Sequence, residues 1–364
     1  MLSIRIDSNN LENDYTMEQK KPLIISGPCS AESREQVLAT AQALAATGKV
    51  DVLRAGIWKP RTKPNTFEGY GVEALPWLAE AREVTGLPIT TEVANAKHVE
   101  EASLYDLDIY WVGARTVSNP FSMQEVAEAL RGTDKMVYVK NPVSADIDLW
   151  AGGVERLLAC GIKNIGLIHR GFSGYGAGDL RNAPMWHLAL EMRRRMPELP
   201  MICDPSHICG NRQYIQDIAQ QAADLGYDGF MIESHICPEK ALSDAKQQLT
   251  PEDFAKVIDS IKWRAEASAS ESFQHALLGL REQIDSLDRE ILKLLAQRMN
   301  VAENIGRIKR ENDVRILQSV RWESIAERTL ARSASLGLSV EFLQTLLDAI
   351  HVESINHQNK IMKE

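Results

Sequence analysis

Short apolar runs recur between residues 21 and 262, and a stretch with apolar residues at helical spacing follows each of them. The stretches 33–47 and 123–130 are rich in alanine, leucine, glutamate and glutamine, which favour helices. The chain holds about eight such units, the number that closes a parallel barrel. The pattern therefore predicts an α/β fold, a (β/α)8 TIM barrel, over residues 21–262. The apolar runs lie at residues 23–26, 50–53, 88–93, 109–113, 136–139, 164–168, 201–203 and 229–232.

The pattern changes on either side of the predicted barrel. Residues 1–20 are polar and weakly patterned, and we assign this segment no function. Residues 263–272 are small and polar, which is typical of a linker. Beyond the linker, apolar residues keep helical spacing over roughly thirty residues, a helix of about 45 Å. A small lone domain cannot cover such a helix, so we expect an all-α domain at 273–364 that forms a homodimer through its helices. The stripe consists of Leu280, Ile284, Leu287, Ile291, Leu294, Val301, Ile305 and Ile308.

Composition limits the class of protein and its partners. A hydrophobic content of 44% with 25% charged residues is typical of a globular protein with a sizeable core. The net charge of −9 argues against nucleic acid or an anionic membrane as a partner, so an anionic substrate needs a local basic pocket. Residues 1–20 lack the apolar core of a signal peptide, and we expect a cytoplasmic protein. Five cysteines without short paired spacings indicate reduced thiols.

Three cations follow the apolar run that ends at Leu53. Arg54, Lys59 and Arg61 stand where a parallel α/β fold places its ligand groups, after the end of a strand. Scattered charges in such a place usually belong to a solvated loop. Here Pro60 fixes the backbone between Lys59 and Arg61, and cations on a stiffened backbone suit a phosphate or carboxylate.

Polar residues also follow the other apolar runs. Barrel enzymes carry their sites at the carboxyl ends of the strands, so these side chains should converge. Taken singly, a cysteine in such a place is usually a small core residue and a carboxylate a solvated rim charge. Their joint placement favours a functional site. The residues are Cys29, Glu92, Arg115, Lys140, Arg170, Asp204, His207, Glu233 and His235.

A metal site is expected at the same rim. Cys29, His207 and Glu233 offer a thiolate, an imidazole and a carboxylate, and Asp244 lies just beyond as a fourth candidate ligand. This mixed set suits Mn²⁺, Fe²⁺ or Zn²⁺ and does not select among them; Mn²⁺ is our working choice. The glycine-rich segment 171–176 is either a flexible loop or a place where backbone amides approach a phosphate.

Together these motifs closely resemble the 3-deoxy-D-arabino-heptulosonate 7-phosphate (DAHP) synthase family, in its type I-beta branch, over about residues 21–262. The resemblance rests on Gly27-Pro-Cys, Lys59-Pro-Arg-Thr62, Gly-Ala-Arg115, Asp204-Pro-Ser-His and Ser-Asp244. It implies condensation of phosphoenolpyruvate with erythrose 4-phosphate and release of phosphate. By the same resemblance the metal ligands are Cys29, His207, Glu233 and Asp244. Phosphoenolpyruvate is held by Arg54, Lys59, Arg115, Lys140 and Arg170 with Asp204 beside them, and the aldose phosphate by Arg61 and Thr62.

In this reaction the divalent ion acts on the aldehyde oxygen, and the enol carbon attacks the aldehyde. Lys59 is our candidate acid, and either Glu92 or a water at the metal handles the other proton. The nearest alternative is the sister synthase that uses arabinose 5-phosphate. That family has an asparagine-rich segment where this chain has Lys-Pro-Arg-Thr, which favours erythrose 4-phosphate.

Cations interrupt the helical stripe of the C-terminal region. Arg298 stands where an apolar residue is expected, and Lys309 lies only about 20° away around the helix. An arginine in such a place usually snorkels to the surface, and a lysine usually forms a surface salt bridge. Two cations on the buried face of a helix dimer instead suggest a dicarboxylate pocket, into which Arg281 of the partner reaches.

This segment resembles the all-helical chorismate mutase family over about residues 273–360. By that resemblance the arginines bind the two carboxylates of chorismate, and Lys309 with Gln358 hydrogen-bonds its ether oxygen. These donors stabilise the charge that develops during rearrangement to prephenate, without a nucleophile or cofactor. The positions that match are Arg281, Arg298, Lys309, Arg321, Ser354 and Gln358.

The segment departs from that family at two positions near the substrate hydroxyl. Gln318 replaces an aspartate, and Trp322 replaces a glutamate. One hypothesis is a working mutase with an altered hydroxyl contact. The other is a module that senses prephenate or chorismate, dimerises and regulates the barrel. We favour catalysis, because the cations and the groups that contact the ether oxygen are all present.

Overall fold

The computed structural model describes residues 21–59, 66–174, 178–265, 267–268, 270–317 and 319–363. The chain divides into two compact units, residues 1–266 and 267–364. Our predictions for residues 1–20, Arg61, Thr62 and Gln318 lie outside the described residues. The limits expected for the linker stay a prediction. Within the described ranges, no helix is both long enough and apolar enough to span a membrane.

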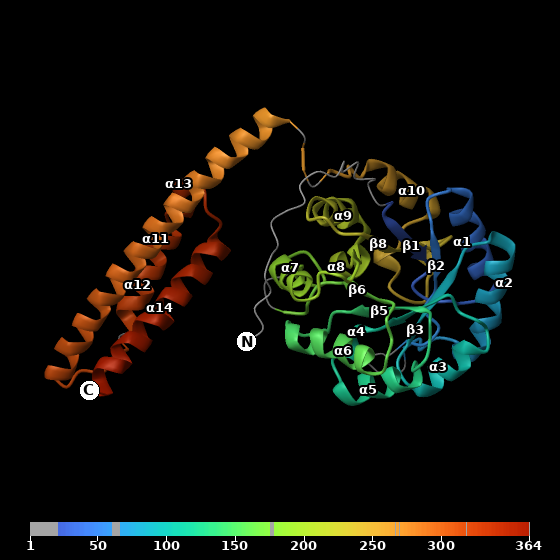
Figure 1. Ribbon diagram of the computed structural model, residues 1–364, viewed down its shortest axis with the longest axis horizontal. Helices are drawn as coiled ribbons and strands as arrows, with labels where there is room; N and C mark the ends of the chain where they lie inside the picture. Colours follow the sequence, from blue (N-terminus) through green and yellow to red (C-terminus); the bar gives the residue numbers. More distant parts are fainter. Residues whose placement is uncertain are drawn as a thin grey trace, which may run out of the picture. The chain divides into compact units, whose positions relative to one another are not determined.

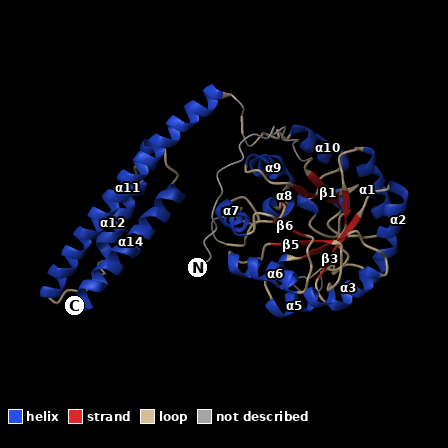
Figure 2. Ribbon diagram, viewed as in Figure 1, coloured by secondary structure: helices blue, strands red, loops and turns tan. Residues whose placement is uncertain are grey.

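The first unit is a closed barrel of eight parallel strands in sequence order (Figures 1 and 2). The last strand pairs with the first, so the sheet has no free edge. This confirms the predicted (β/α)8 fold. The strands are β1 Leu23–Gly27, β2 Val52–Arg54, β3 Ile89–Val93, β4 Ile109–Val112, β5 Met136–Lys140, β6 Ile165–His169, β7 Met201–Cys203 and β8 Gly229–Glu233.

Several charged residues that we expected after the strands are the last residues within them. Arg54 pairs with Thr90, and Lys140 pairs with Ile168. Glu233 pairs with Gly27. Their backbones are therefore fixed by the sheet ladder, which makes these side chains more rigidly placed than loop residues would be.

The interior of the barrel is filled by apolar side chains in strand alternation. Val52, Tyr138 and Met231 belong to the inner cluster of buried residues. Residues two positions apart share a face of a strand, so Arg54, Lys140 and Glu233 point to the same interior, one step nearer the carboxyl ends. The remaining fully buried members of the cluster are Ile25, Trp111, Ile168 and Ile202. The core thus forms the floor of the site.

Helices surround the strands as the outer layer (Figure 2). Their starts agree with the local sequence: the Ser33 side chain caps α1 by accepting from Gln36 N, and Asn119 caps α5 ahead of Pro120. The α-helices are α1 Arg34–Ala46, α2 Leu75–Thr85, α3 Ala96–Ser103, α4 Ala114–Val117, α5 Pro120–Ala129, α6 Ile147–Ala159, α7 Trp186–Arg195, α8 Pro205–Cys209, α9 Ile215–Asp224 and α10 Pro251–Ser260. Short 3-10 turns are η1 Gly71–Ala74, η2 Arg212–Tyr214, η3 Pro238–Lys240 and η4 Ala245–Gln247.

The second unit is entirely helical in its described residues (Figure 1). Helix α11 is 41 residues long, about 60 Å, and exceeds the predicted length. It packs against α14. The helices are α11 Glu271–Glu311, α12 Ser319–Leu330, α13 Ser333–Leu336 and α14 Val340–Lys363.

The apolar stripe of α11 is not buried within this unit. Ile284, Ile291 and Leu294 are 57%, 53% and 64% exposed. The face of α11 that is covered carries Met299, Ala302 and Gly306 instead. Small residues there let α14 approach closely: a Cβ at Gly306 would lie 3.2 Å from Gln358 Cα. A long apolar face is thus left without a covering element among the described residues.

Candidate active sites

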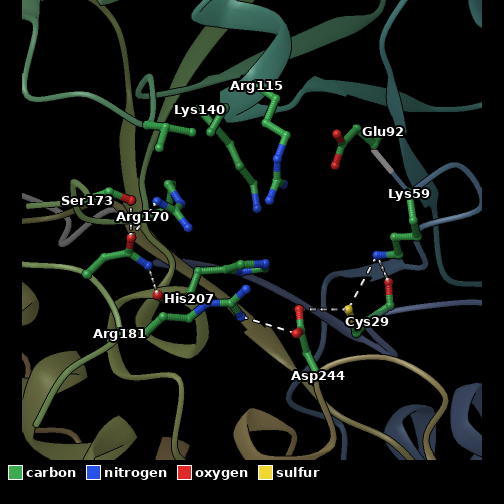
Figure 3. Close-up of a pocket in the computed structure, with 13 residues that line it drawn as sticks. Cys29, Lys59, Glu92, Arg115, Lys140, Arg170, Ser173, Arg181, His207 and Asp244 are labelled. Carbon is green, nitrogen blue, oxygen red and sulfur yellow. Dashed lines mark hydrogen bonds and ion pairs between the residues drawn. The ribbon is translucent and has the colours of Figure 1, made fainter. Parts of the chain in front are cut away.

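The carboxyl ends of the barrel strands enclose a cavity of about 220 Å³. Most of the predicted residues line it, and in Figure 3 the nitrogen ends of Arg115, Lys140 and Arg170 point toward one space. Arg54 and Glu233 lie buried beside it, at 1% and 0% exposure. The charged and polar lining residues are Cys29, Lys59, Glu92, Arg115, Lys140, Arg170, Ser173, Arg181, Asn182, His207 and Asp244.

A sulfur and two carboxylates meet at one side of the cavity. One ligand atom each of Cys29, Glu233 and Asp244 lies within 4.8 Å of the others. Glu233 Oε1 is buried without a hydrogen bond among the described residues. Burial, followed by the charge of Glu233, raises the pKa of the Cys29 thiol to about 11. A divalent cation would add a ligand bond to Glu233 Oε1, whose charge is otherwise met by the ion pair with Arg54, and would stabilise the thiolate, so these residues fit a metal ion.

His207 lies next to this group rather than within it. Its Nε2 is 3.7 Å from Glu233 Oε1, and its Nδ1 is 2.8 Å from Asp204 Oδ2. Asp204 caps the short helix α8 by accepting from His207 N. Burial lowers the pKa of His207 even though Asp204 opposes this, so the imidazole is neutral, the form that binds metals. Three of the four predicted ligands therefore converge, with the fourth beside Glu233.

Buried cations form the opposite wall. Lys140 Nζ lies 2.7 Å from Asp204 Oδ2. Burial opposes ionisation of Asp204, but His207 and Lys140 hold its pKa well below the usual value. Arg170 Nη1 donates to Asn182 Oδ1 at 3.0 Å. Burial lowers the pKa of Arg170 to about 10, so it stays charged at neutral pH.

Arg54 is less accessible than the sequence suggested. Its guanidinium stacks over Trp111 at 4.8 Å, and Nη1 lies 3.2 Å from Glu233 Oε1. It does not belong to the residues that line the cavity. This position lets Arg54 compensate the buried carboxylate from below, because an unpaired charge there would be costly.

Lys59 and Glu92, our candidates for proton transfer, both line the cavity. Lys59 Nζ lies 3.4 Å from Cys29 Sγ and also donates to the Cys29 carbonyl. Glu92 Oε2 accepts from Trp111 Nε1 at 3.1 Å. A Cβ at Gly113 would stand 2.0 Å from Glu92 Oε1, so a larger residue there would displace this carboxylate from its present position.

A second polar group lies between α11 and α14. Arg298 Nη1 donates to Ser354 Oγ, and Gln358 is 8% exposed with Oε1 buried and without a partner among the described residues. Lys309 Nζ donates to the Ile316 carbonyl. Burial lowers the pKa values of Arg298 and Lys309, as expected for cations at a partly enclosed site.

Arg281 does not reach this group within one chain. It lies on α11 about 25 Å from Arg298, given 1.5 Å per residue. Trp322 lies on helix α12, and its ring stacks on the ring of His351 with 3.9 Å between the ring centroids. Arg321 is also on α12. The predicted residues Arg298, Ser354 and Gln358 are therefore together, and Arg281 is apart.

Comparison with known proteins identifies the barrel. The DAHP synthetase I family matches residues 7–268. Phospho-2-dehydro-3-deoxyheptonate aldolase of Thermotoga maritima is 34% identical over 244 residues, which cover 67% of this chain and 70% of that protein. This chain belongs to the DAHP synthetase I family. DAHP synthases depend on a metal ion, which agrees with the Cys29, Glu233 and Asp244 group.

Other relatives of this chain carry the name of a different aldolase. A 2-dehydro-3-deoxyphosphooctonate aldolase of Nitrobacter winogradskyi is 30% identical over 266 residues, 67% of this chain and 88% of that protein. A crystal structure of the Thermotoga maritima phospho-2-dehydro-3-deoxyheptonate aldolase (DAHP synthase) has a TM-score of 0.60 at 32% identity. The matched region covers 66% of this chain and 68% of the chain in that crystal structure.

The C-terminal unit matches a second family. Chorismate mutase type II matches residues 280–359. The chain thus joins a DAHP synthase domain, a transferase, to a chorismate mutase domain, an isomerase, and both resemblances are confirmed.

Sequence reasoning missed several residues of the DAHP synthase site. Asn182, Arg181 and Ser173 line the cavity, but none directly follows a strand. Gln247 donates to Glu233 Oε2 at 2.7 Å from the turn η4. The glycine-rich segment before Arg181 was the only signal nearby, and it does not say which later side chains turn inward.

Proposed function

We propose that the cavity at the barrel mouth is where the DAHP synthase domain condenses phosphoenolpyruvate with erythrose 4-phosphate. The supporting observation is that Lys59, Arg115, Lys140 and Arg170 line one cavity together with Cys29 and Asp244. Phosphoenolpyruvate carries a phosphate and a carboxylate, and several fixed cations are the groups that bind such a ligand. Asp204 fixes Lys140 by an ion pair and remains charged.

The condensation forms one carbon–carbon bond and breaks one carbon–oxygen bond. The terminal enol carbon of phosphoenolpyruvate attacks the aldehyde carbon, and a water adds to the former enol carbon. The bond from that carbon to the phosphate oxygen then breaks as the new hydroxyl passes its proton to the departing phosphate, which leaves a ketone. Lys59 donates the proton that converts the aldehyde oxygen to a hydroxyl, and Glu92 accepts a proton from the water. Cys29, His207, Glu233 and Asp244 would hold a divalent ion, which would polarise the aldehyde as a Lewis acid.

The types of metal-binding side chain at this site favour a transition-metal ion. A thiolate and an imidazole beside two carboxylates suit Mn²⁺, Fe²⁺ or Zn²⁺ better than a hard ion such as Ca²⁺. Mn²⁺ is our first choice. Metal analysis of the protein purified without chelator tests this, and finding only Mg²⁺ or Ca²⁺ would contradict it.

Erythrose 4-phosphate is the proposed aldose, with Arg61 and Thr62 holding its phosphate. Phosphate release is measured with erythrose 4-phosphate and, separately, with arabinose 5-phosphate. Activity with arabinose 5-phosphate alone would overturn the proposal. Arg61→Ala should raise KM for the aldose phosphate much more than KM for phosphoenolpyruvate.

For the second domain we propose that Arg298, Lys309, Ser354 and Gln358, with Arg321, bind chorismate and promote its rearrangement to prephenate. The buried Gln358 Oε1 without a partner among the described residues and the partly buried cations support a polar ligand. A binding module without turnover is the alternative. Residues 265–364 form prephenate from chorismate under the first proposal and bind without forming it under the second.

A homodimer completes this mutase site. The exposed stripe of α11, with Leu287 at 58% and Ile308 at 61%, supports a second copy as its cover. Arg281 would then enter the site of the partner.

A mixing experiment tests this exchange. Arg281→Ala and Arg298→Ala chains are each inactive, but one heterodimer site keeps both arginines. After equal mixing and subunit exchange, half of the dimers are mixed, so mutase activity should return to about a quarter of the native value. No recovery, with exchange verified by mass spectrometry, would contradict a shared site.

A further inference from the structure

Each carboxylate beside Cys29 has one oxygen tied by a neighbour outside the predicted set. Arg181 Nη1 lies 3.2 Å from Asp244 Oδ1, and Figure 3 shows it pointing at that carboxylate. The same nitrogen donates to Gln247 Oε1 at 2.9 Å. Gln247 Nε2 in turn donates to Glu233 Oε2 at 2.7 Å. One continuous network therefore contacts both carboxylates.

The other oxygen of each carboxylate faces the metal group. Asp244 Oδ2 lies 3.7 Å from Cys29 Sγ. Glu233 Oε1 is buried and accepts no hydrogen bond among the described residues, but it lies 3.2 Å from Arg54 Nη1. The network thus holds one oxygen of each carboxylate and makes no contact with the other, which lies near Cys29 in Asp244 and near Arg54 in Glu233.

The backbone of this segment is fixed to Cys29 as well. Gln248 Oε1 accepts from Cys29 N at 2.8 Å, and Gln247 N donates to the Asp244 carbonyl at 3.1 Å. Asp244 adopts a φ of 48°, a left-handed conformation that non-glycine residues rarely occupy. The ion pair with Arg181 restrains the carboxylate of this residue in addition to its backbone.

We propose that Arg181 and Gln247 are positioning residues that orient Asp244 and Glu233 for the divalent ion. This inference rests on the proposed metal centre. A carboxylate with one oxygen already held loses less rotational freedom when the other oxygen binds a metal. Loss of such outer partners typically weakens metal affinity about ten- to a hundredfold.

Arg181 also lines the substrate cavity, so a direct contact with a substrate anion is the competing role. The two roles differ in what changes. A positioning residue alters metal affinity in the absence of substrate, whereas a substrate ligand alters KM at saturating metal.

The test measures metal affinity of the full chain by competition with a chromophoric chelator, using Mn²⁺ and Zn²⁺ without substrate. Arg181→Gln and Gln247→Leu should each weaken binding about ten- to a hundredfold. Because both residues act through one network, the metal affinity of the double variant should be only slightly below that of the single variant with the lower affinity. Co²⁺ bound to each variant should also show a changed thiolate charge-transfer band, and Arg181→Lys should recover part of the affinity.

Arg195→Gln is the matched control, because Arg195 forms exposed ion pairs with Glu191 and Asp148 on the barrel surface. Its metal affinity should equal that of the native chain. Native affinity in Arg181→Gln, with a raised KM for either substrate, would overturn the inference. If Gln247→Leu fails to fold, Arg181→Gln decides, since the Arg181 side chain is 41% exposed. A native chain that binds neither ion would instead refute the metal centre itself.

Discussion

Lys140 Nζ lies 2.7 Å from Asp204 Oδ2, although 64 residues separate the two in the sequence. Both are almost fully buried, and Asp204 is shared with His207 at 2.8 Å. The pair links the end of β5, in the cation wall, to the residue that follows β7, which also contacts His207 beside the metal group. It therefore serves the fold and the site at once.

Asp204→Asn should destabilise the barrel by about 3–5 kcal/mol at pH 7, because it leaves the charge of Lys140 buried without its partner. Denaturant unfolding of the full chain, followed by tryptophan fluorescence, measures this. Because the pKa of Asp204 is lower in the folded chain than in the unfolded chain, its contribution to the free energy of unfolding is complete above about pH 4. This contribution is lost as pH falls from there toward the pKa of Asp204 in the folded chain. The difference from the native chain should therefore shrink below pH 4.

Asp148→Asn is the control, since Asp148 is 83% exposed in its ion pair with Arg195. Its unfolding midpoint should equal that of the native chain. A native midpoint for Asp204→Asn as well would mean that the buried pair does not stabilise the barrel.

His169 should make the barrel less stable as pH falls from about 6.5 to 4. It is enclosed by aromatic rings, and Tyr227 Oη lies 2.8 Å from its Nδ1. Burial lowers the pKa of His169 to about 4, whereas in the unfolded chain it is about 6.5. As pH falls below 6.5, the unfolded chain therefore takes up a proton at this histidine before the folded chain does. The loss amounts to about 3 kcal/mol across this interval.

His169→Gln should flatten that part of the stability curve, measured by urea unfolding at a series of pH values. His187→Gln, at an exposed position of α7, should keep the native slope. An unchanged slope in His169→Gln would show that another group causes the pH dependence.

Arg170→Gln should raise KM for phosphoenolpyruvate about ten- to a hundredfold, the effect of losing one charge-assisted contact. KM for the aldose phosphate should change much less. Steady-state phosphate release measures both constants, and mutase activity of the same chain is the internal control. Equal changes in both KM values would place Arg170 outside the phosphoenolpyruvate subsite.

Gln358→Leu should lower kcat of the mutase about a hundred- to a thousandfold, because a donor to the developing charge is lost. Leucine fills the buried space between α11 and α14, so the helices should remain paired. Absorbance loss of chorismate measures the rate, and circular dichroism checks the helices. Full mutase activity would exclude Gln358 from the reaction.

The barrel could be predicted because its strands are short apolar runs with helices of regular spacing between them. The rule that sites lie at strand ends then selected Cys29, Glu92, Lys140 and Arg170. That rule does not reach Arg181 or Asn182, which lie far along the loop between β6 and α7 rather than directly after the strand. Their inward direction depends on tertiary contacts that the local sequence does not encode.

Burial in the C-terminal domain was harder to predict. Periodicity identified the apolar stripe of α11 but not which face meets α14. The buried face carries Met299 together with the small residues Ala302 and Gly306, and a Cβ at Gly306 would already lie 3.2 Å from Gln358 Cα. The larger stripe remains exposed in the single chain, as expected if a second copy covers it.

The most direct test of two separate chemistries in one chain is a paired assay with metal removed and restored. DAHP synthase and chorismate mutase activities are measured on the same sample, first after chelation and then after addition of Mn²⁺. We predict that synthase activity disappears and returns, while mutase activity stays constant throughout. Loss of both activities on chelation would contradict the division of labour between the two domains.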